Sequence, residues 1–169
     1  MASVKEFEVI IAGGGIAGLT LANMLEKFDL DYVVLEGHSE ISPAVGASIG
    51  MFPNGLRILD QLGCYEPIQE LFGFFNHLEK RHGYGLLFFD RQKMLEILYN
   101  HVQHKEKVLL NKKVTGLDLI DGGVSVSCAD GSVYTGTIVI GADGVHSAVR
   151  GANSLSLIDL WRFRSVMNF

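Results

Sequence analysis

The chain has 169 residues, of which 48% are apolar, and a formal net charge of −5 at pH 7. This length fits one domain with a hydrophobic core, or one domain and part of another. The mildly acidic balance, without a run of Lys and Arg, argues against a nucleic acid as partner. The apolar stretches are shorter than the ~20 residues of a membrane-spanning helix, and we expect no signal peptide.

The two cysteines, Cys64 and Cys128, are far apart and lack the neighbouring ligands of a metal site. We expect two reduced core thiols in an intracellular protein, either cytoplasmic or peripherally associated with a membrane. His101 and His104 have helical spacing, but a third ligand is not apparent, so no metal site is predicted.

The most informative stretch runs from Val9 to Glu36. An apolar run leads into a Gly-x-Gly-x-x-Gly turn made by Gly13, Gly15 and Gly18. A helical stretch and a second apolar run follow, and this second run ends on the acid. Strand, glycine turn, helix, strand and acid in this order form the dinucleotide-binding fingerprint in its required context.

Each glycine of this fingerprint has an expected role. Gly13 permits the tight turn, Gly15 lets a pyrophosphate approach the backbone, and Gly18 lets the helix pack on the strand. The helix begins at these glycines, so its free N–H groups face the phosphates. Glu36 is expected to accept hydrogen bonds from ribose hydroxyls, and the absence of Arg or Lys directly after it favours the unphosphorylated ribose of NAD or FAD. A glycine turn that binds nothing is the alternative.

The first elements are predicted as a strand over 8–12, a helix over about 15–28 and a strand over 31–36. The helix is expected to turn one apolar face toward the sheet, because several of its residues recur at helical spacing. These residues are Leu21, Met24, Leu25 and Phe28.

A long irregular loop of small residues is predicted over 38–54, either a ligand-binding loop or a surface excursion. Pro53 is placed to start a helix that stops at Gly63, with Leu56, Leu59 and Leu62 on its buried side. A short helix is predicted over 67–72. Residues 73–85 show no periodicity, and we interpret their two histidines as part of a solvated loop.

Asp90 is a good N-cap for the next predicted helix, which ends near His104. Its buried face is predicted from Met94, Leu95, Leu98 and Val102. Arg91 lies in the first turn, where a cation opposes the helix dipole and needs a partner. A ligand phosphate would be such a partner, and solvent is the alternative.

From Val108 onward the apolar period changes to two. Three short strands over 114–120, 124–128 and 133–135 predict a small antiparallel meander, separated by Asp-Gly turns. A further short strand over 137–140 ends in a second glycine-rich turn.

This second turn begins the segment GADGVHSAVR, from Gly141 to Arg150. The segment resembles the D-G-x-x-S-x-x-R motif of group A, single-component flavoprotein monooxygenases, the class of para-hydroxybenzoate hydroxylase and squalene epoxidase. Residues 41–68, with SPAVGASIG and FPNGLRILDQLGCYEPI, look closer still to fungal FAD-dependent epoxidases of indole-diterpene and meroterpenoid pathways. The resemblance covers about Phe7 to Arg150, and the two motifs together are more specific than either alone.

The resemblance implies an α/β fold, a Rossmann-like FAD-binding domain of the glutathione-reductase type with a parallel sheet and a small antiparallel β-meander. Residues 1–150 would be the N-terminal part of that domain, and 151–169 an atypical tail. The family's second FAD motif and substrate sheet lie beyond this sequence, so a truncated product is expected.

The resemblance also implies site residues. In the expected arrangement the fingerprint glycines hold the FAD pyrophosphate, the acid holds the adenosine ribose, and the remaining residues lie beside the flavin or the pyrophosphate. The cofactor-binding set is Gly13, Gly15, Gly18, Glu36, Gly50, Arg91, Asp143 and Gly144. A catalytic residue is not assigned.

The implied function is FAD-dependent monooxygenation with NADPH and O2, as epoxidation of a prenylated secondary-metabolite intermediate. The expected partner is therefore a small molecule, a prenylated terpenoid. Two alternatives stay open: a non-catalytic flavin-binding remnant, and an NAD(P)-dependent oxidoreductase that uses only the first fingerprint. The antiparallel meander and the Asp143-Gly144 motif disfavour the second alternative.

Overall fold

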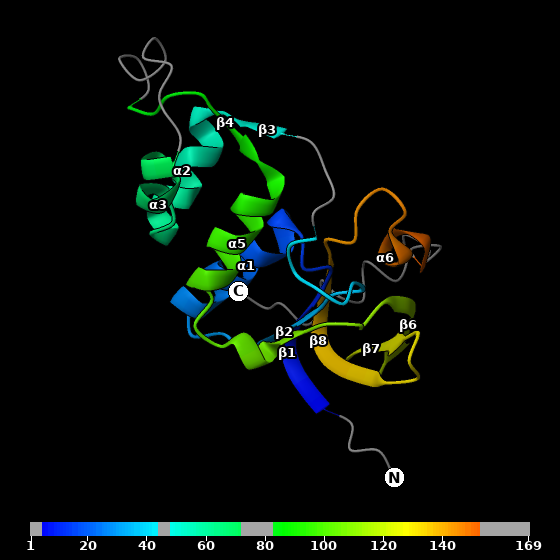
Figure 1. Ribbon diagram of the computed structural model, residues 1–169. Helices are drawn as coiled ribbons and strands as arrows, with labels where there is room; N and C mark the ends of the chain where they lie inside the picture. Colours follow the sequence, from blue (N-terminus) through cyan, green and yellow to red (C-terminus); the bar gives the residue numbers. More distant parts are fainter. Residues whose placement is uncertain (1–4, 44–47, 72–82, 153–169) are drawn as a thin grey trace.

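The computed structural model describes residues 5–43, 48–71 and 83–152 (Figure 1). Its elements are, in chain order, β1 (Lys5–Ala12), α1 (Ile16–Lys27), β2 (Tyr32–Leu35), β3 (Ser48–Met51), α2 (Pro53–Leu62), α3 (Tyr65–Leu71), β4 (Leu87–Asp90), α5 (Arg91–His101), the 3-10 turn η1 (Lys105–Lys107), β5 (Val108–Leu109), β6 (Val114–Ile120), β7 (Gly123–Cys128), β8 (Val133–Gly141) and α6 (Ala148–Ala152). Residues 153–169, which include most of the predicted tail, lie outside the described part, as do His77 and His82.

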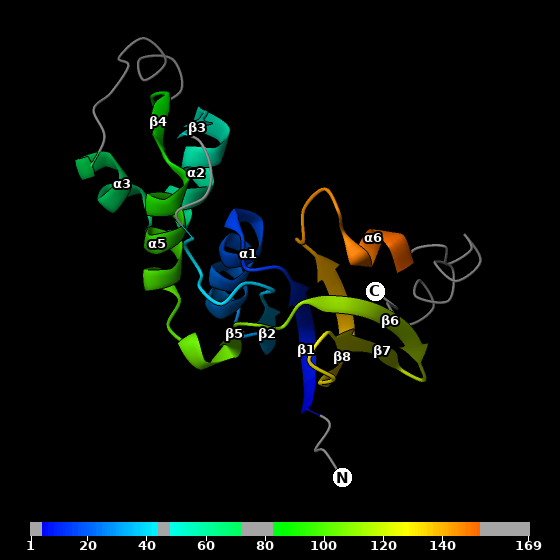
Figure 2. The same cartoon turned by 45° about the vertical axis from the view of Figure 1, so that its right-hand side comes forward.

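Six strands form one mixed sheet in the order β5-β2-β1-β8-β7-β6. The first four run parallel, and β7 and β6 continue the sheet antiparallel from β8. Helix α1 lies between α5 and the parallel strands, while α6 lies beyond β8 (Figure 2). The predicted fold class, a parallel sheet with a small antiparallel meander, is confirmed.

Strand β8 joins the two parts of the sheet. The sequence predicted two strands here, over 133–135 and 137–140, and the structure shows one continuous strand. Gly136 lies between the two predicted strands and is packed closely against β1. A Cβ at Gly136 would lie 3.0 Å from both the Phe7 carbonyl oxygen and the Ile10 side chain. The glycine therefore lets β8 pair closely with β1.

A second, two-stranded sheet was missed by the sequence analysis. Residues 48–51, which were predicted as loop, pair antiparallel with 87–90, so that Gly50 lies opposite Phe88. Leu87 and Phe89 are buried, and Phe88 between them is 57% exposed. This alternation is typical of a strand with one buried face.

The buried face of α1 differs from the prediction. The residues that it buries are Gly18, Leu19, Ala22, Asn23 and Leu25. Asn23 turns this face toward α5, because its side-chain amide donates to the carbonyl oxygens of Leu19 and Leu98 at 2.8 and 3.0 Å. Leu21 and Met24 are only partly buried, and Phe28, at the C-cap, is 75% exposed. The prediction for Phe28 was therefore wrong.

The predicted faces and caps of α2 and α5 are confirmed. Leu56, Leu59 and Leu62 are buried, as are Met94, Leu95, Leu98 and Val102. Gly63 ends α2 in the left-handed conformation with φ +85°, and the Asp90 carboxylate accepts a hydrogen bond from Gln92 N at 2.8 Å. Helix α5 ends at His101, three residues earlier than predicted, because the backbone beyond it turns to bind Glu26.

Both cysteines are free and buried, as expected. Burial raises the pKa of the Cys64 thiol to about 11. Within the described ranges, no helix combines the length and the apolar character needed to cross a membrane.

Candidate functional site

The candidate site lies at the edge of the sheet where β1, β2 and β8 end. The register pairs Ala12 with both Leu35 and Gly141, so the three parallel strands end side by side. The fingerprint turn, Glu36 and the second glycine turn follow these strand ends directly and are therefore adjacent in space (Figure 1). The carboxyl edge of a parallel sheet is where α/β proteins bind ligands.

Gly13 joins the two glycine turns. Its φ of +105° is a left-handed conformation, and an added Cβ would overlap the carbonyl group of Ala142. Ala142 N donates to Ala12 O at 2.7 Å, and Gly13 N donates to Leu35 O at 2.8 Å. The need for glycine at this position therefore has an explanation inside the fold: a turn that is tight and packed against a second backbone segment.

Gly18 and Gly15 differ in what surrounds them. A Cβ at Gly18 would overlap Gly13 O and contact the Ile11 side chain, so this glycine lets α1 press against the turn. A Cβ at Gly15 would meet nothing within 4 Å. Gly15 is the N-cap of α1, whose first turn has no acidic residue and no side-chain cap. The open space beside Gly15 thus adjoins backbone N–H groups that are suited to an anion.

Glu36 is held in place by three hydrogen bonds. Its Oε2 accepts from Gly14 N at 2.6 Å, and its Oε1 accepts from His38 N at 2.8 Å and His38 Nδ1 at 2.7 Å. Burial raises the pKa of Glu36, but the bonds from His38 and Gly14 outweigh burial and hold that pKa below its ordinary value. The carboxylate is therefore ionised near neutral pH, and Oε2 keeps capacity for one further donor.

Asp143 builds the second turn. Its Oδ2 accepts from Ala148 N at 2.7 Å and Val149 N at 3.3 Å, at the start of α6. Burial raises the pKa of Asp143, but hydrogen bonds from Ser147 and the backbone lower it below the ordinary value. Its Oδ1 is buried without a hydrogen-bond partner among the described residues. A buried acceptor without a donor marks a place where a water or a ligand hydroxyl would bind.

The other residues of the second motif bond mainly to one another. Ser147 Oγ accepts from Arg150 N at 2.9 Å, and the Arg150 guanidinium donates to Val145 O. Gly144 has a φ of +77°, and a Cβ there would meet nothing within 4 Å. The motif thus folds a turn that carries Asp143 to the edge of the first glycine turn.

Gly50 lies in β3 and Arg91 begins α5, in the part of the molecule drawn above the strand ends in Figure 1. Gly50 lies in a strand and not in a loop as predicted, and a Cβ there would lie 2.9 Å from the Phe88 ring. Arg91 opens α5 directly after Asp90. Their predicted contact with a flavin stays a prediction.

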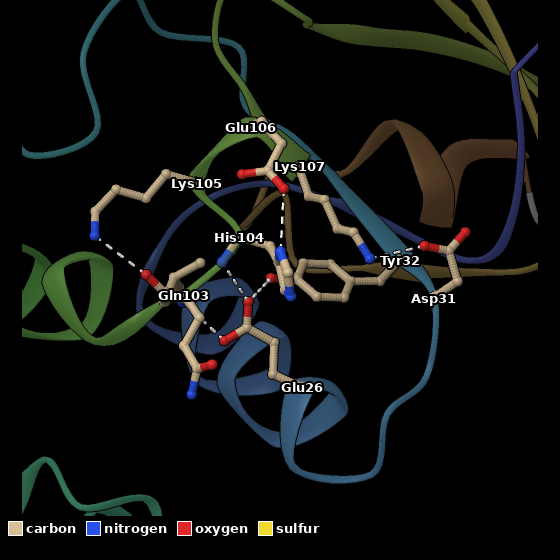
Figure 3. Close-up of polar contacts among 9 residues, drawn as sticks. Glu26, Asp31, Tyr32, Gln103, His104, Lys105, Glu106 and Lys107 are labelled. Carbon is tan, nitrogen blue, oxygen red and sulfur yellow. Dashed lines mark hydrogen bonds and ion pairs between the residues drawn. The ribbon is translucent and has the colours of Figure 1, made fainter.

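Away from the candidate site, a polar network joins the end of α1 to β2 and to the chain after α5 (Figure 3). The Glu26 carboxylate, at the end of α1, accepts from Tyr32 Oη at 2.7 Å and from the backbone N of both Gln103 and His104 at 2.9 Å. Lys107 Nζ binds Asp31 Oδ1 at 2.8 Å and lies 5.2 Å from the centre of the Tyr32 ring. These residues border a surface hollow, and none of them was predicted to belong to a site.

The part of the chain that the structure describes contains no group of three or more His, Cys, Asp or Glu side chains able to hold a metal ion.

Comparison with known proteins places this geometry in a family. Residues 6–160 match the family described as FAD binding domain. The FAD-dependent monooxygenase prhF of Penicillium brasilianum is 46% identical, over 94% of this chain and 36% of the relative. The FAD-dependent monooxygenase paxM of Penicillium paxilli is 40% identical, over 95% of this chain and 36% of the relative.

Solved structures of two further proteins superpose on this chain. Klebsiella pneumoniae HpxO, in complex with FAD and uric acid, superposes with a TM-score of 0.74 at 28% identity, over 85% of this chain and 41% of that one. The p-nitrophenol 4-monooxygenase PnpA of Pseudomonas putida DLL-E4 superposes with a TM-score of 0.77 at 25% identity, over 88% of this chain and 44% of that one.

The chain thus spans 36% of the length of these curated relatives. The family match covers most of the chain, and the resemblance inferred from the two glycine turns is confirmed. This chain therefore belongs to the FAD binding domain family, together with fungal proteins named FAD-dependent monooxygenases.

Proposed function

We propose that this chain forms the FAD-binding part of an FAD-dependent monooxygenase and that FAD lies along the edge where β1, β2 and β8 end. One observation carries the proposal. The open space at Gly15 adjoins the N-terminus of α1, while the neighbouring glycines Gly13 and Gly18 are explained by packing. The HpxO structure in complex with FAD and the names of the curated relatives support the same cofactor.

The residues present fit an adenine dinucleotide. In this proposal the pyrophosphate occupies the space at Gly15 and accepts hydrogen bonds from the first N–H groups of α1. The adenosine ribose lies beside Glu36 Oε2, which keeps acceptor capacity. The orphaned Oδ1 of Asp143 offers a second acceptor at the same edge. Gly144, Gly50 and Arg91 remain proposed contacts from the surrounding turns.

Bound FAD would supply the redox chemistry, taking electrons from NADPH and using O2 to oxidise a substrate. For epoxidation the balance is alkene, O2, NADPH and a proton giving epoxide, water and NADP⁺. We propose a prenylated secondary-metabolite intermediate as the alkene, on the resemblance of residues 41–68 to fungal epoxidases. The contribution of this chain is to bind and orient the cofactor.

A second candidate function is flavin binding without turnover. Ile138 favours it, because this residue of the central strand β8 is 45% exposed. Parallel strands are normally covered on both faces. Additional chain, present in the longer relatives, would be needed to cover this strand and enclose the cofactor.

The decisive experiment compares two glycine variants of the 169-residue protein. A Cβ would meet nothing within 4 Å at either Gly15 or Gly116, but only Gly15 lies at the candidate site. We expect Gly15→Ala to weaken FAD binding about tenfold or more, because a methyl group displaces phosphate from charge-assisted hydrogen bonds. Gly116→Ala should bind as the parent does, and both should melt near the parent temperature. Equal FAD affinity of Gly15→Ala and the parent would refute the placement of FAD.

A further inference from the structure

His38 supplies two of the three hydrogen bonds that hold the Glu36 carboxylate. Its backbone N and its ring Nδ1 both donate to Oε1, at 2.8 and 2.7 Å. The backbone around this contact is fixed by the segment after β5. Asn111 N donates to His38 O at 2.9 Å, and Lys112 N donates to Glu36 O at 2.7 Å. The His38 side chain is itself 73% exposed, so burial does not explain its position.

The chemistry of the pair defines which atom donates. Because the pKa of Glu36 is held below its ordinary value, its carboxylate is ionised near neutral pH and acts only as an acceptor. His38 Nδ1 must therefore carry the hydrogen of this contact.

The two carboxylate oxygens of Glu36 accept different numbers of hydrogen bonds. Oε1 accepts two hydrogen bonds from His38, and Oε2 accepts one from Gly14 N. Oε2 therefore offers the remaining lone pair, on the side of the glycine turn. Without the His38 ring, the carboxylate would keep only its two backbone donors, Gly14 N and His38 N, and would be held less firmly in this orientation.

We propose that His38 is a positioning residue for the adenosine ribose: its ring Nδ1 holds Glu36 so that Oε2 receives a ribose hydroxyl. The inference rests on the proposed function, since it needs an adenine dinucleotide at this edge. It deepens that function by assigning hydroxyl recognition to a pair of residues. Among the described residues, the His38 ring pairs with Glu36, Glu40 lies two residues along the chain, and Lys112 and Lys113 directly follow Asn111, whose N–H donates to His38 O. The Lys112 ammonium is bound to Asp130.

Three variants of His38 test whether a hydrogen-bond donor at the place of Nδ1, and not just a side chain of similar size, is required. In His38→Asn the amide nitrogen takes the place of Nδ1, in His38→Gln the donor moves one bond farther out, and in His38→Ala it is lost. The backbone bond from residue 38 remains in all three. FAD, ADP, 2′-deoxy-ADP and 3′-deoxy-ADP are titrated into each protein by calorimetry, with melting temperatures measured in parallel.

We expect the parent to bind ADP about tenfold more tightly than at least one deoxy analogue, because that analogue lacks a hydroxyl that donates to the charged Glu36 carboxylate. His38→Ala and His38→Gln should lose most of this preference, and His38→Asn should keep it. All variants should melt near the parent temperature, because the ring is exposed.

The outcomes distinguish the two proposals. An undiminished hydroxyl preference in His38→Ala overturns the role of His38 and leaves FAD binding intact. A parent that binds FAD without preferring either hydroxyl also overturns the inference alone. A parent that binds neither FAD nor ADP overturns the proposed function and this inference with it.

Discussion

Replacing Glu26 tests whether the network in Figure 3 holds the end of α1 to β2 and to the chain after α5. Glu26→Ala leaves the hydroxyl of the buried Tyr32 without its acceptor. An unpaired buried donor costs about 1–3 kcal/mol. The backbone N–H groups of Gln103 and His104 are exposed, so water can replace the lost carboxylate as their acceptor. Loss of these two hydrogen bonds therefore adds little to the destabilisation. We therefore expect a loss of about 2 kcal/mol, which lowers Tm by roughly 4–8 °C for a domain of this size.

The assay is thermal unfolding followed by circular dichroism, with two further variants. Glu96→Ala is the matched control, because among the described residues Glu96 pairs only with exposed Lys93, at 2.7 Å, and such pairs contribute under about 1 kcal/mol. Tyr32→Phe removes the donor, so Glu26→Ala should cost less in that background. A Tm of Glu26→Ala equal to that of Glu96→Ala would refute the reasoning.

The same comparison has a defined pH dependence. Burial raises the pKa of Glu26, but hydrogen bonds from Gln103, His104 and Tyr32 lower it below the ordinary value. A carboxylate with a lowered folded pKa stabilises the fold above the unfolded pKa, and this contribution disappears as pH falls through the folded pKa. The gap between parent and Glu26→Ala should therefore be full at pH 7 and shrink below about pH 4.5. A gap that widens in acid would contradict this sign.

Two further predictions concern the candidate site. Gly18→Ala should lower stability by about 1–3 kcal/mol even without FAD, because the added methyl overlaps Gly13 O; a melting temperature equal to that of Gly116→Ala would contradict this. FAD affinity at pH 5 should match that at pH 7, because hydrogen bonds hold the pKa of Glu36 below its ordinary value despite burial; a tenfold weaker Kd at pH 5, absent in Glu36→Gln, would contradict it.

Features that depend on neighbours along the chain were predictable from the sequence. The fingerprint order from β1 to Glu36, the cap at Asp90 and the left-handed glycine at Gly63 all follow from local backbone chemistry. The glycine roles were predictable in kind, but only the structure separates Gly15, with open space, from Gly13 and Gly18, which pack against backbone.

Features that depend on distant pairing were not predictable. The β3–β4 ribbon joins two four-residue segments that are far apart in sequence, and neither shows a strand signal strong enough alone. The contact between His38 and Glu36 needs the turn after β2 to be fixed by Asn111 and Lys112, which come from another strand end. Phe28, the C-cap of α1, is exposed, while Asn23 lies on the buried face and binds Leu98 O of α5, and an apolar pattern carries no information about that hydrogen bond.

The last prediction is that the 169-residue protein binds FAD without oxygenating a substrate. Monooxygenation needs a flavin site from which water is excluded, because water diverts reactive species into wasteful breakdown. The chain spans 36% of its curated relatives, and Ile138 and Phe88 leave apolar surface exposed on both of its sheets. Supplied with FAD, NADPH and a prenylated alkene, the protein should therefore pass the electrons of any NADPH that it oxidises to O2, so that NADPH, O2 and a proton give NADP⁺ and hydrogen peroxide. NADPH and O2 consumption are measured together, with peroxide by a coupled assay and epoxide by mass spectrometry. Epoxide formed in proportion to NADPH would show that these residues alone enclose the reacting part of the cofactor.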